Sequence, residues 1–345
     1  MSYYFPSILT DLNFKDKNLP DSVMTVNSGE NAVRLLLRSY GMQPKAKVAL
    51  PVYVCDSLKE AVLKEGFEPM YLDLKPGSFH TDYNFKEKPD VVILVHLYGF
   101  IHPDTQIVMN YCRDNSIKLI HDAAQSYGID ESKLTYSSGI VYSFGPGKSS
   151  TAAGGAIVKG LSKEFNSHHC KRAADFSIQN FTADLFLKSR LYGHQFSLKD
   201  KILSKIISRL SHSKEITSMT FFQRAAAQKA MDMVKARVSD RRERYTLLEE
   251  AVRSNTLLSV PYNEGKGMYF KMVISCKDST HLKEYLKKNN VPFFSLKEGL
   301  NIAKEVHNTF PEFSKSGGGF VELSTEASLP MEEVKRVAEI LRQFS

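Results

Sequence analysis

Short apolar runs alternate with helix-like stretches over the first 160 residues of this 345-residue chain. Several runs are apolar at nearly every position, which is typical of strands that are buried on both faces of a parallel sheet. The predicted strands are residues 48–51, 70–73, 90–96, 118–121, 140–143 and 155–158. This alternation predicts an α/β fold, with polar residues at the carboxyl ends of the strands, where open sheets of this class bind ligands.

The pattern changes after residue 160. A basic, helical stretch covers residues 160–215, and helical spacing then predicts one long helix over 221–253. Beyond it the pattern indicates a strand at 269–274, a helix at 281–288 and a final amphipathic helix at 330–341. We therefore predict a large α/β domain over residues 1–250, with residues 160–215 as an insertion, and a small C-terminal α+β domain over residues 251–345.

Composition places the chain among ordinary globular proteins, with 42% hydrophobic and 24% charged residues. The four cysteines form no CxxC pair, which fits a reducing compartment. The amino terminus has no basic segment leading into an apolar stretch, and no apolar run approaches the ~18 residues of a membrane span. A cytoplasmic location is the expectation.

The net charge of +8 is unevenly spread, because the stretch from 159 to 215 holds eleven Lys or Arg against five Asp or Glu. A solvated helical surface is the first interpretation of this excess. Attraction of an anionic ligand or of a membrane face is the second, and a nucleotide diphosphate would need only a few of these cations. Nucleic acid is not expected, since no aromatic-basic module accompanies the charge.

Candidate chemistry gathers at the ends of two neighbouring predicted strands. Asp122 and Gln125 follow the strand at 118–121, and Ser143 and Lys148 lie at and after the end of the next one. A lysine, a carboxylate, an amide and a hydroxyl are what a pyridoxal phosphate site needs. The lysine bonds to the cofactor aldehyde, the carboxylate keeps the pyridine nitrogen protonated, and the hydroxyl helps to bind the phosphate.

Each of these residues also has an ordinary structural interpretation. Asp122 alone could cap the next helix, and Gln125 could be a surface amide. Lys148 could be an exposed loop lysine. It could also end a Walker motif, but GxxxxGK[ST] needs a glycine where this chain has Tyr142.

A second candidate phosphate site is the helix start at Ser28 and Gly29. Ser28 is a plausible N-cap, and the amide groups of a first helical turn attract anions. Most such helix starts bind nothing, and Glu30 opposes an anion unless its side chain turns away.

The sequence resembles the DegT/DnrJ/EryC1-type sugar aminotransferases, which are pyridoxal phosphate enzymes of fold type I. Residues 26–32 (VNSGENA) resemble the family's SGTxA helix start, and residues 49–53 (ALPVY) resemble its VPSYTF strand end. The HLYG turn matches at 96–99, EDAAQ at 121–125, and SFxxxK…GGA at 143–156. Five motifs in the family's order cover much of the chain.

The resemblance implies a large domain with a mostly parallel seven-stranded sheet and a small α+β domain. It implies that Lys148 bonds to the cofactor and moves a proton, that Asp122 pairs with the pyridine nitrogen, and that Gln125 lies near the ring hydroxyl. Ser143 would bind the phosphate together with the backbone of Gly29 and Glu30, beside Ser28 and Cys55.

Three departures from the family pattern stand out. Cys55 occupies a position where the family often stacks an aromatic ring on the cofactor, and Glu30 stands where threonine is usual. The GYNYR-like segment, through which a neighbouring subunit reaches the site, is replaced by residues 219–224 (MTFFQR).

The resemblance implies amino transfer from glutamate or glutamine to a keto sugar, nucleotide-linked, in polysaccharide or related sugar synthesis. It also implies a homodimer. Two alternatives stay open: a pyridoxal phosphate lyase, decarboxylase or aminotransferase that acts on a small non-sugar compound, and a catalytically silent binding or regulatory protein. A nicotinamide-dependent oxidoreductase is disfavoured, since no GxGxxG follows the first strand.

Overall fold

The structure is a computed structural model of the chain. It describes residues 23–145, 147–150, 152, 154–161, 165, 170–171, 215–261, 267–295, 309–315, 320–326 and 329–345. The basic stretch predicted over 160–215 lies almost entirely outside the described residues, and so does its predicted helical character.

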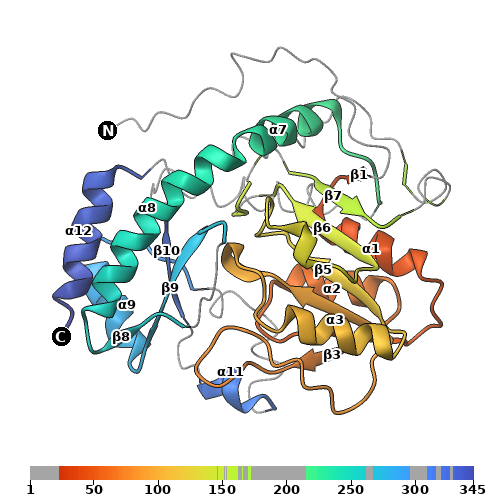
Figure 1. Ribbon diagram of the computed structural model, residues 1–345, viewed down its shortest axis with the longest axis horizontal. Coiled ribbons are helices and arrows are strands. Elements are labelled where there is room, and N and C mark those ends of the chain that lie inside the picture. Colours follow the sequence, from red (N-terminus) through yellow and green to blue (C-terminus); the bar gives the residue numbers. More distant parts are fainter. Residues whose placement is uncertain are drawn as a thin grey trace, which may run out of the picture.

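Within the described residues, the larger sheet has seven strands in the order β1-β7-β6-β5-β4-β2-β3 (Figure 1). Their bounds are β1 Val23–Val26, β2 Lys47–Pro51, β3 Glu68–Leu72, β4 Val91–Val95, β5 Lys118–Asp122, β6 Gly139–Ser143 and β7 Ala156–Lys159. Strands β3, β2, β4, β5 and β6 pair in parallel, whereas β7 pairs antiparallel with both β6 and β1. The predicted α/β fold with a mostly parallel seven-stranded sheet is confirmed.

The continuous apolar runs are explained by helices on both faces of this sheet. Val91 and Ile93 of β4 belong to a core cluster that includes side chains of α1 Gly29–Ser39 and α2 Asp56–Lys64. The alternate residues Val92 and Leu94 pack in another cluster, with α3 Thr105–Asp114. Because successive side chains of a strand point to opposite faces, a strand that is covered twice must be apolar throughout.

The smaller sheet is antiparallel, in the order β10-β9-β8, with β8 Leu258–Ser259, β9 Lys271–Cys276 and β10 Val321–Ser324. Helices α9 Ser279–Lys288 and α12 Met331–Arg342 accompany it, and α11 Pro311–Lys315 lies apart, near β3 (Figure 1). Helix α8 Val234–Arg253 runs from α7 Phe221–Asp232, beside the large sheet, to α12 and the small sheet. Since α8 crosses residue 250, the domain division at that residue stays a prediction.

Several predicted element bounds differ from the structure. The single helix predicted over 221–253 is two consecutive helices, α7 and α8, joined at Met233. Helical spacing could not show this joint, because Met233 keeps helical backbone angles. Strands β1, β8 and β10, of two to four residues, were not predicted. Runs this short carry little periodicity, although β7, of the same length as β1, was predicted at residues 155–158.

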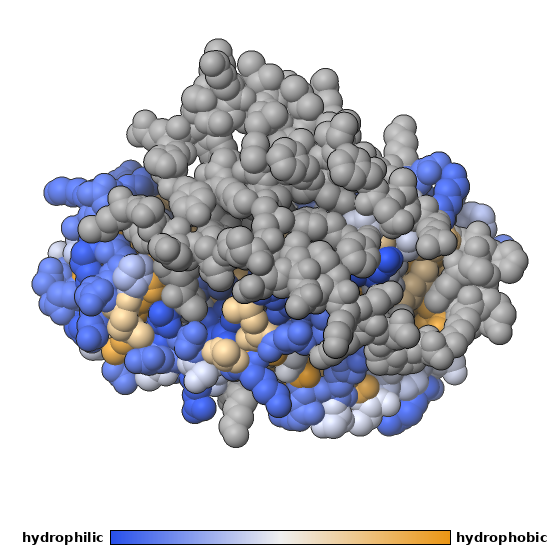
Figure 2. Space-filling view, turned by 90° about the horizontal axis from the view of Figure 1, so that it is seen from above, coloured by the Kyte–Doolittle hydropathy of each residue, from blue (hydrophilic) through white to orange (hydrophobic). Residues whose placement is uncertain are grey.

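The surface of the described residues is mostly hydrophilic on the face shown in Figure 2, with apolar residues in small separate groups. Among the described residues, no helix combines the length and the hydrophobicity needed to cross a membrane.

Candidate active site

A pocket lies at the carboxyl ends of β4 and β5, and four of the predicted site residues line it. Its lining residues are Val54, Cys55, Val95, His96, Leu97, Asp122, Ala124, Gln125 and Lys148. Parallel strands end at the same edge of a sheet, so the loops that follow them converge there. The structure thus brings Cys55, Asp122, Gln125 and Lys148 together from three loops, which follow β2, β5 and β6.

Asp122 is the buried carboxylate of this pocket. It ends β5, between β4 and β6, and its side chain is almost fully removed from solvent. Its Oδ1 accepts the Ala124 N–H at 2.9 Å. Burial raises the pKa of Asp122, while the positive charge of Lys148 and this hydrogen bond act in the opposite direction. A positively charged ligand group beside Asp122 would stabilise the ionised form of this buried carboxylate.

Gln125 presents an oriented amide to the pocket. The Tyr98 N–H donates to Gln125 Oε1 at 2.8 Å, which fixes which end of the amide is oxygen. Tyr98 belongs to the 3₁₀ turn η1 Leu97–Gly99, which follows β4. Because the oxygen is engaged, the amide nitrogen is the group with which Gln125 can bind a ligand.

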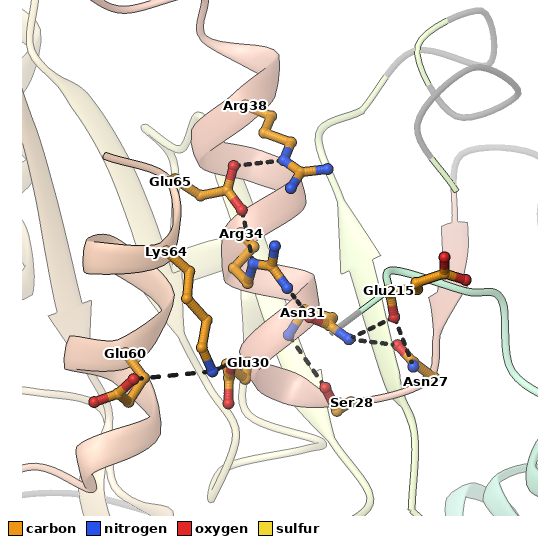
Figure 3. Close-up of polar contacts among 10 residues, drawn as sticks. All are labelled: Asn27, Ser28, Glu30, Asn31, Arg34, Arg38, Glu60, Lys64, Glu65 and Glu215. Carbon is orange, nitrogen blue, oxygen red and sulfur yellow. Dashed lines mark hydrogen bonds and ion pairs between the residues drawn. The ribbon is translucent and has the colours of Figure 1, made fainter. Parts of the chain in front are cut away.

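The start of α1 lies close to Ser143, so the N–H groups of the helix start and the Ser143 hydroxyl could bind the same anion. Ser28 caps the helix by accepting the Asn31 N–H at 3.2 Å (Figure 3). Ser143 Oγ accepts the Gly145 N–H at 3.4 Å. A Cβ added to Gly29 would lie 3.1 Å from Ser143 Oγ, so only glycine lets the helix start approach this hydroxyl so closely. The first N–H groups of a helix have no acceptor inside the helix and can bind an anion.

Glu30 does not oppose an anion at this helix start. Lys64 of α2 forms an ion pair with it, with Lys64 Nζ 2.6 Å from Glu30 Oε1 (Figure 3). The side chain turns toward α2, so its charge is offset there. We call the start of α1 at Gly29 together with Ser143 the Gly29–Ser143 cradle. Glutamate in place of threonine at residue 30 leaves the backbone N–H groups of this cradle available to an anion.

The helix start is braced from two sides. Asn31 donates to Asn27 Oδ1 at 2.9 Å and to the Glu215 carbonyl at 3.3 Å (Figure 3). Arg34 pairs with Glu65, which lies just after α2, at 2.7 Å. These contacts fix the position of α1 relative to α2 and to residue 215.

His96 lines the pocket and was not predicted as a site residue, although the HLYG turn contains it. Its Nδ1 accepts the His102 N–H at 3.1 Å, so its proton is on Nε2, which lies 3.1 Å from His121 Nδ1. His121 then carries its own proton on Nε2 and donates to the Tyr136 carbonyl at 3.0 Å. Burial lowers the pKa of both imidazoles, so the pair is neutral beneath the pocket.

Arg241 of α8 contacts the loop that carries Lys148, between β6 and β7. It is 1% exposed, and its Nη2 donates to the Ser149 carbonyl at 2.5 Å and to Glu326 Oε1 at 2.6 Å. The contact lies on the residue next to Lys148, so α8 holds the loop that carries the lysine. Sequence reasoning missed this role because Arg241 stands in a run of charged residues that is typical of an exposed helix.

Residues 219–224 occupy the place of the family's GYNYR-like segment and do not line the pocket. Thr220 caps α7 through a capping box with Gln223. Met219 packs on Gly155, where an added Cβ would lie 2.6 Å from its side chain. In this chain the segment 219–224 therefore packs against Gly154 and Gly155, at the end of the loop that carries Lys148.

The arrangement fits pyridoxal phosphate. The Gly29–Ser143 cradle would hold the phosphate, the buried Asp122 carboxylate suits a protonated pyridine nitrogen, and the Gln125 amide suits the ring hydroxyl. Lys148 lines the same pocket and would supply the amine that bonds to the aldehyde. Cys55 occupies the wall where the family often has an aromatic ring, so stacking on that side is weak.

The model of the DegT/DnrJ/EryC1/StrS aminotransferase family matches residues 13–342 of this chain. The 3-oxo-glucose-6-phosphate:glutamate aminotransferase of Bacillus subtilis (strain 168) is 28% identical over 168 residues, which cover 47% of this chain and 37% of that protein. The dTDP-3-amino-3,4,6-trideoxy-alpha-D-glucose transaminase of Micromonospora megalomicea subsp. nigra is 24% identical over 220 residues, 60% of this chain and 55% of that protein. The matched segments span less than two thirds of either relative.

The fold recurs in solved structures. DesV of S. venezuelae, solved in complex with a ketimine intermediate, has a TM-score of 0.71 at 18% sequence identity. The match covers 93% of this chain and 84% of that one. At this identity the likeness shows that the fold is the same.

Proposed function

Since the chain belongs to the DegT/DnrJ/EryC1/StrS aminotransferase family, whose enzymes use pyridoxal phosphate, we propose that it transfers an amino group to a keto sugar. The observation that carries the proposal is the convergence of Asp122, Gln125 and Lys148 on one pocket, at the same sheet edge as the Gly29–Ser143 cradle. The end of β5 with its loop, the end of β6 with its loop, and the start of α1 each contribute a type of group that the cofactor needs.

When bound, pyridoxal phosphate supplies an aldehyde that carries the amino group and a ring that accepts electrons from the substrate carbon. Asp122 keeps the ring nitrogen protonated, which maintains that electron demand. Gln125 donates to the ring oxygen. Lys148, in the same pocket, would bond to the cofactor aldehyde and would hold and return a proton as general base and acid.

The cofactor is oriented by its phosphate end. Ser143 and the N–H groups of Gly29 and Glu30 bind the phosphate, and Ser28 keeps the helix start in place. Because Lys64 offsets the Glu30 charge, the net field at this end favours an anion. Cys55 and His96 line the same pocket and would contribute to the walls around the cofactor.

The proposed acceptor is a nucleotide-linked keto sugar, with glutamate or glutamine as amino donor. One relative's name specifies a 3-oxo sugar phosphate with glutamate, and another's specifies a dTDP-linked amino sugar, so both names contain a sugar that carries phosphate. Polysaccharide or related sugar synthesis, a cytoplasmic location, a homodimer and a domain division at residue 250 are parts of the same proposal. The basic residues between 160 and 215 would attract the substrate's phosphates.

Product analysis tests the proposal. Purified protein with pyridoxal phosphate and glutamate is incubated with a set of keto sugar nucleotides and keto sugar phosphates, and the amino sugar is detected by mass spectrometry. Lys148→Ala should abolish the product, whereas Lys159→Ala, at the exposed end of β7, should retain it. Amination of simple keto acids alone would replace the sugar assignment, and product from Lys148→Ala would overturn the role of the lysine.

A further inference from the structure

A buried carboxylate of the small sheet lies directly behind the pocket wall. Glu322 of β10 is 1% exposed and forms an ion pair with Lys271 of β9. The hydroxyl of Tyr98, in the turn after β4, donates to Glu322 Oε1 at 2.9 Å. These three residues, Tyr98, Glu322 and Lys271, are named here the Glu322 triad. The triad joins the small sheet to the large one.

The buried phenol groups next to Glu322 keep their protons. The hydroxyl of Tyr53, at the end of β2, lies 2.9 Å from that of Tyr98. Both rings are fully buried, and burial together with the nearby Glu322 charge raises the pKa of each tyrosine. Tyr98 therefore remains a donor to Glu322, and Tyr53 can donate to Tyr98 in turn.

The backbone of Tyr98 adopts an unusual conformation at this point. Its φ is +56°, in the left-handed region that non-glycine residues rarely adopt. The small-domain segment 268–270 pairs with the turn, because the Phe270 N–H donates to the Tyr98 carbonyl at 3.2 Å and the Met268 N–H donates to the Gly99 carbonyl at 2.7 Å. Side chain and backbone of Tyr98 are thus both held by the small domain.

The same residue orients the cofactor-facing amide. The Tyr98 N–H that donates to Gln125 Oε1 belongs to this left-handed residue, so a change in the conformation of the turn would redirect the donor. We propose that Glu322 is a positioning residue, which through Tyr98 keeps the Gln125 amide nitrogen directed at the ring hydroxyl of the cofactor. The inference rests on the proposed function, because it concerns how the cofactor is held.

The positioning role has a spectroscopic consequence. A donor to the ring oxygen stabilises its anionic form, so loss of that donor raises the pH at which the visible band of the bound cofactor titrates. Gln125→Ala should raise this midpoint by about one pH unit, the size expected for one hydrogen bond to a charged oxygen. Tyr98→Phe and Glu322→Gln, which preserve shape, should raise it by about half as much.

A matched control exists elsewhere in the chain. Tyr142 of β6 donates to Glu131 Oε1 at 2.7 Å, and Lys159 of β7 pairs with the same carboxylate at 2.7 Å. Tyr142, Glu131 and Lys159, named here the Glu131 triad, are chemically the same set as the Glu322 triad. The difference is that Tyr98 of the Glu322 triad also donates its backbone N–H to Gln125, which lines the pocket. Tyr142→Phe should leave the titration midpoint unchanged.

The experiment combines this titration with hydrogen exchange in the cofactor-free protein. Exchange at the Tyr98 amide should accelerate about tenfold in Glu322→Gln and in Tyr98→Phe, and stay as in the wild type in Tyr142→Phe, because the hydrogen bond to Gln125 loosens only in the first two. In a Gln125→Ala background, Glu322→Gln should shift the spectral midpoint no further.

The outcomes separate the two claims. If the wild-type protein forms no visible band with pyridoxal phosphate, the proposed function fails. If the band forms but Glu322→Gln shifts the midpoint as much with Gln125→Ala as without it, Glu322 acts by another route and the positioning role is wrong. Unchanged exchange at Tyr98 in both variants would overturn the inference as well.

Discussion

The Glu322 triad and the Glu131 triad use the same three residue types in two different environments. In each, a tyrosine hydroxyl and a lysine ammonium share one glutamate, and the lysine lies 5.9 Å from the centre of the tyrosine ring. The glutamate and lysine side chains are 2% and 17% exposed in the Glu322 triad, but 39% and 35% exposed in the Glu131 triad. Burial is therefore the variable that differs most.

The comparison shows that contact geometry alone does not determine how much an ion pair contributes to stability. Exposed ion pairs contribute little, because water and salt screen them and because two long side chains lose mobility. A buried pair has already lost its hydration, so removal of one partner leaves the other with an uncompensated charge. The Glu322 triad should therefore be critical for the junction between the sheets, and the Glu131 triad dispensable.

Glu322→Ala should produce the largest effect. It leaves Lys271 and Tyr98 without their acceptor in a buried site, so the free energy of unfolding should fall by about 3 kcal/mol. Chemical denaturation monitored by circular dichroism measures it. If the loss were as small as that of Glu131→Ala, burial would not be the deciding variable.

Tyr98→Phe should have the next largest effect on stability. It removes one buried hydroxyl between Glu322 and Tyr53, which should lower the free energy of unfolding by about 2 kcal/mol. The ring and its packing on Phe79 are kept, so a larger loss would mean that the hydroxyl supports more than this junction. The same denaturation assay applies, with Tyr142→Phe as reference.

Acid should lower the free energy of unfolding through the buried imidazoles of His96 and His121. Burial, followed by the charges of other histidines, holds the pKa of His96 well below its usual value, and burial also lowers that of His121. The unfolded chain therefore binds more protons below about pH 6.5, so stability is complete above that pH and falls as the pH decreases.

Denaturation curves between pH 7.5 and 5 measure this slope. His121→Gln should reduce it, since one of the imidazoles whose pKa is lowered by burial is gone, and Tyr142→Phe should leave it unchanged. A slope that is identical in the wild type and in His121→Gln would contradict the neutral-pair description.

The smallest effect is expected for Glu131→Gln. The carboxylate and its lysine partner are largely accessible to water, so stability should change by less than about 1 kcal/mol, and by less still in high salt. A loss comparable to that of Glu322→Gln, in the same assay, would break the comparison.

The sheet and the polar residues at the strand ends could be predicted from the sequence because each corresponds to a recognisable pattern within a short segment. Doubly buried strands are apolar throughout, and Asp122 and Ser143 stand at their last positions. Helix starts such as Ser28 are marked by a capping residue. These signals need only short stretches of chain.

The residues that position the site show no such pattern. Glu322 is 224 residues from Tyr98, and Arg241 is 92 residues from Ser149, so only the tertiary fold reveals either contact. Arg241, Glu322 and Lys271 are charged residues, which sequence patterns assign to the surface. The break at Met233 and the antiparallel direction of β7 are likewise set by packing.

The absorption spectrum of the purified protein with pyridoxal phosphate, recorded before and after addition of glutamate, tests the central claim most directly. We expect a visible band that is bleached by glutamate in the wild type and in Lys159→Ala, and that is missing in Lys148→Ala. A band of equal strength in Lys148→Ala, or no band in the wild type, would contradict the assignment of this pocket as a pyridoxal phosphate site that acts through Lys148.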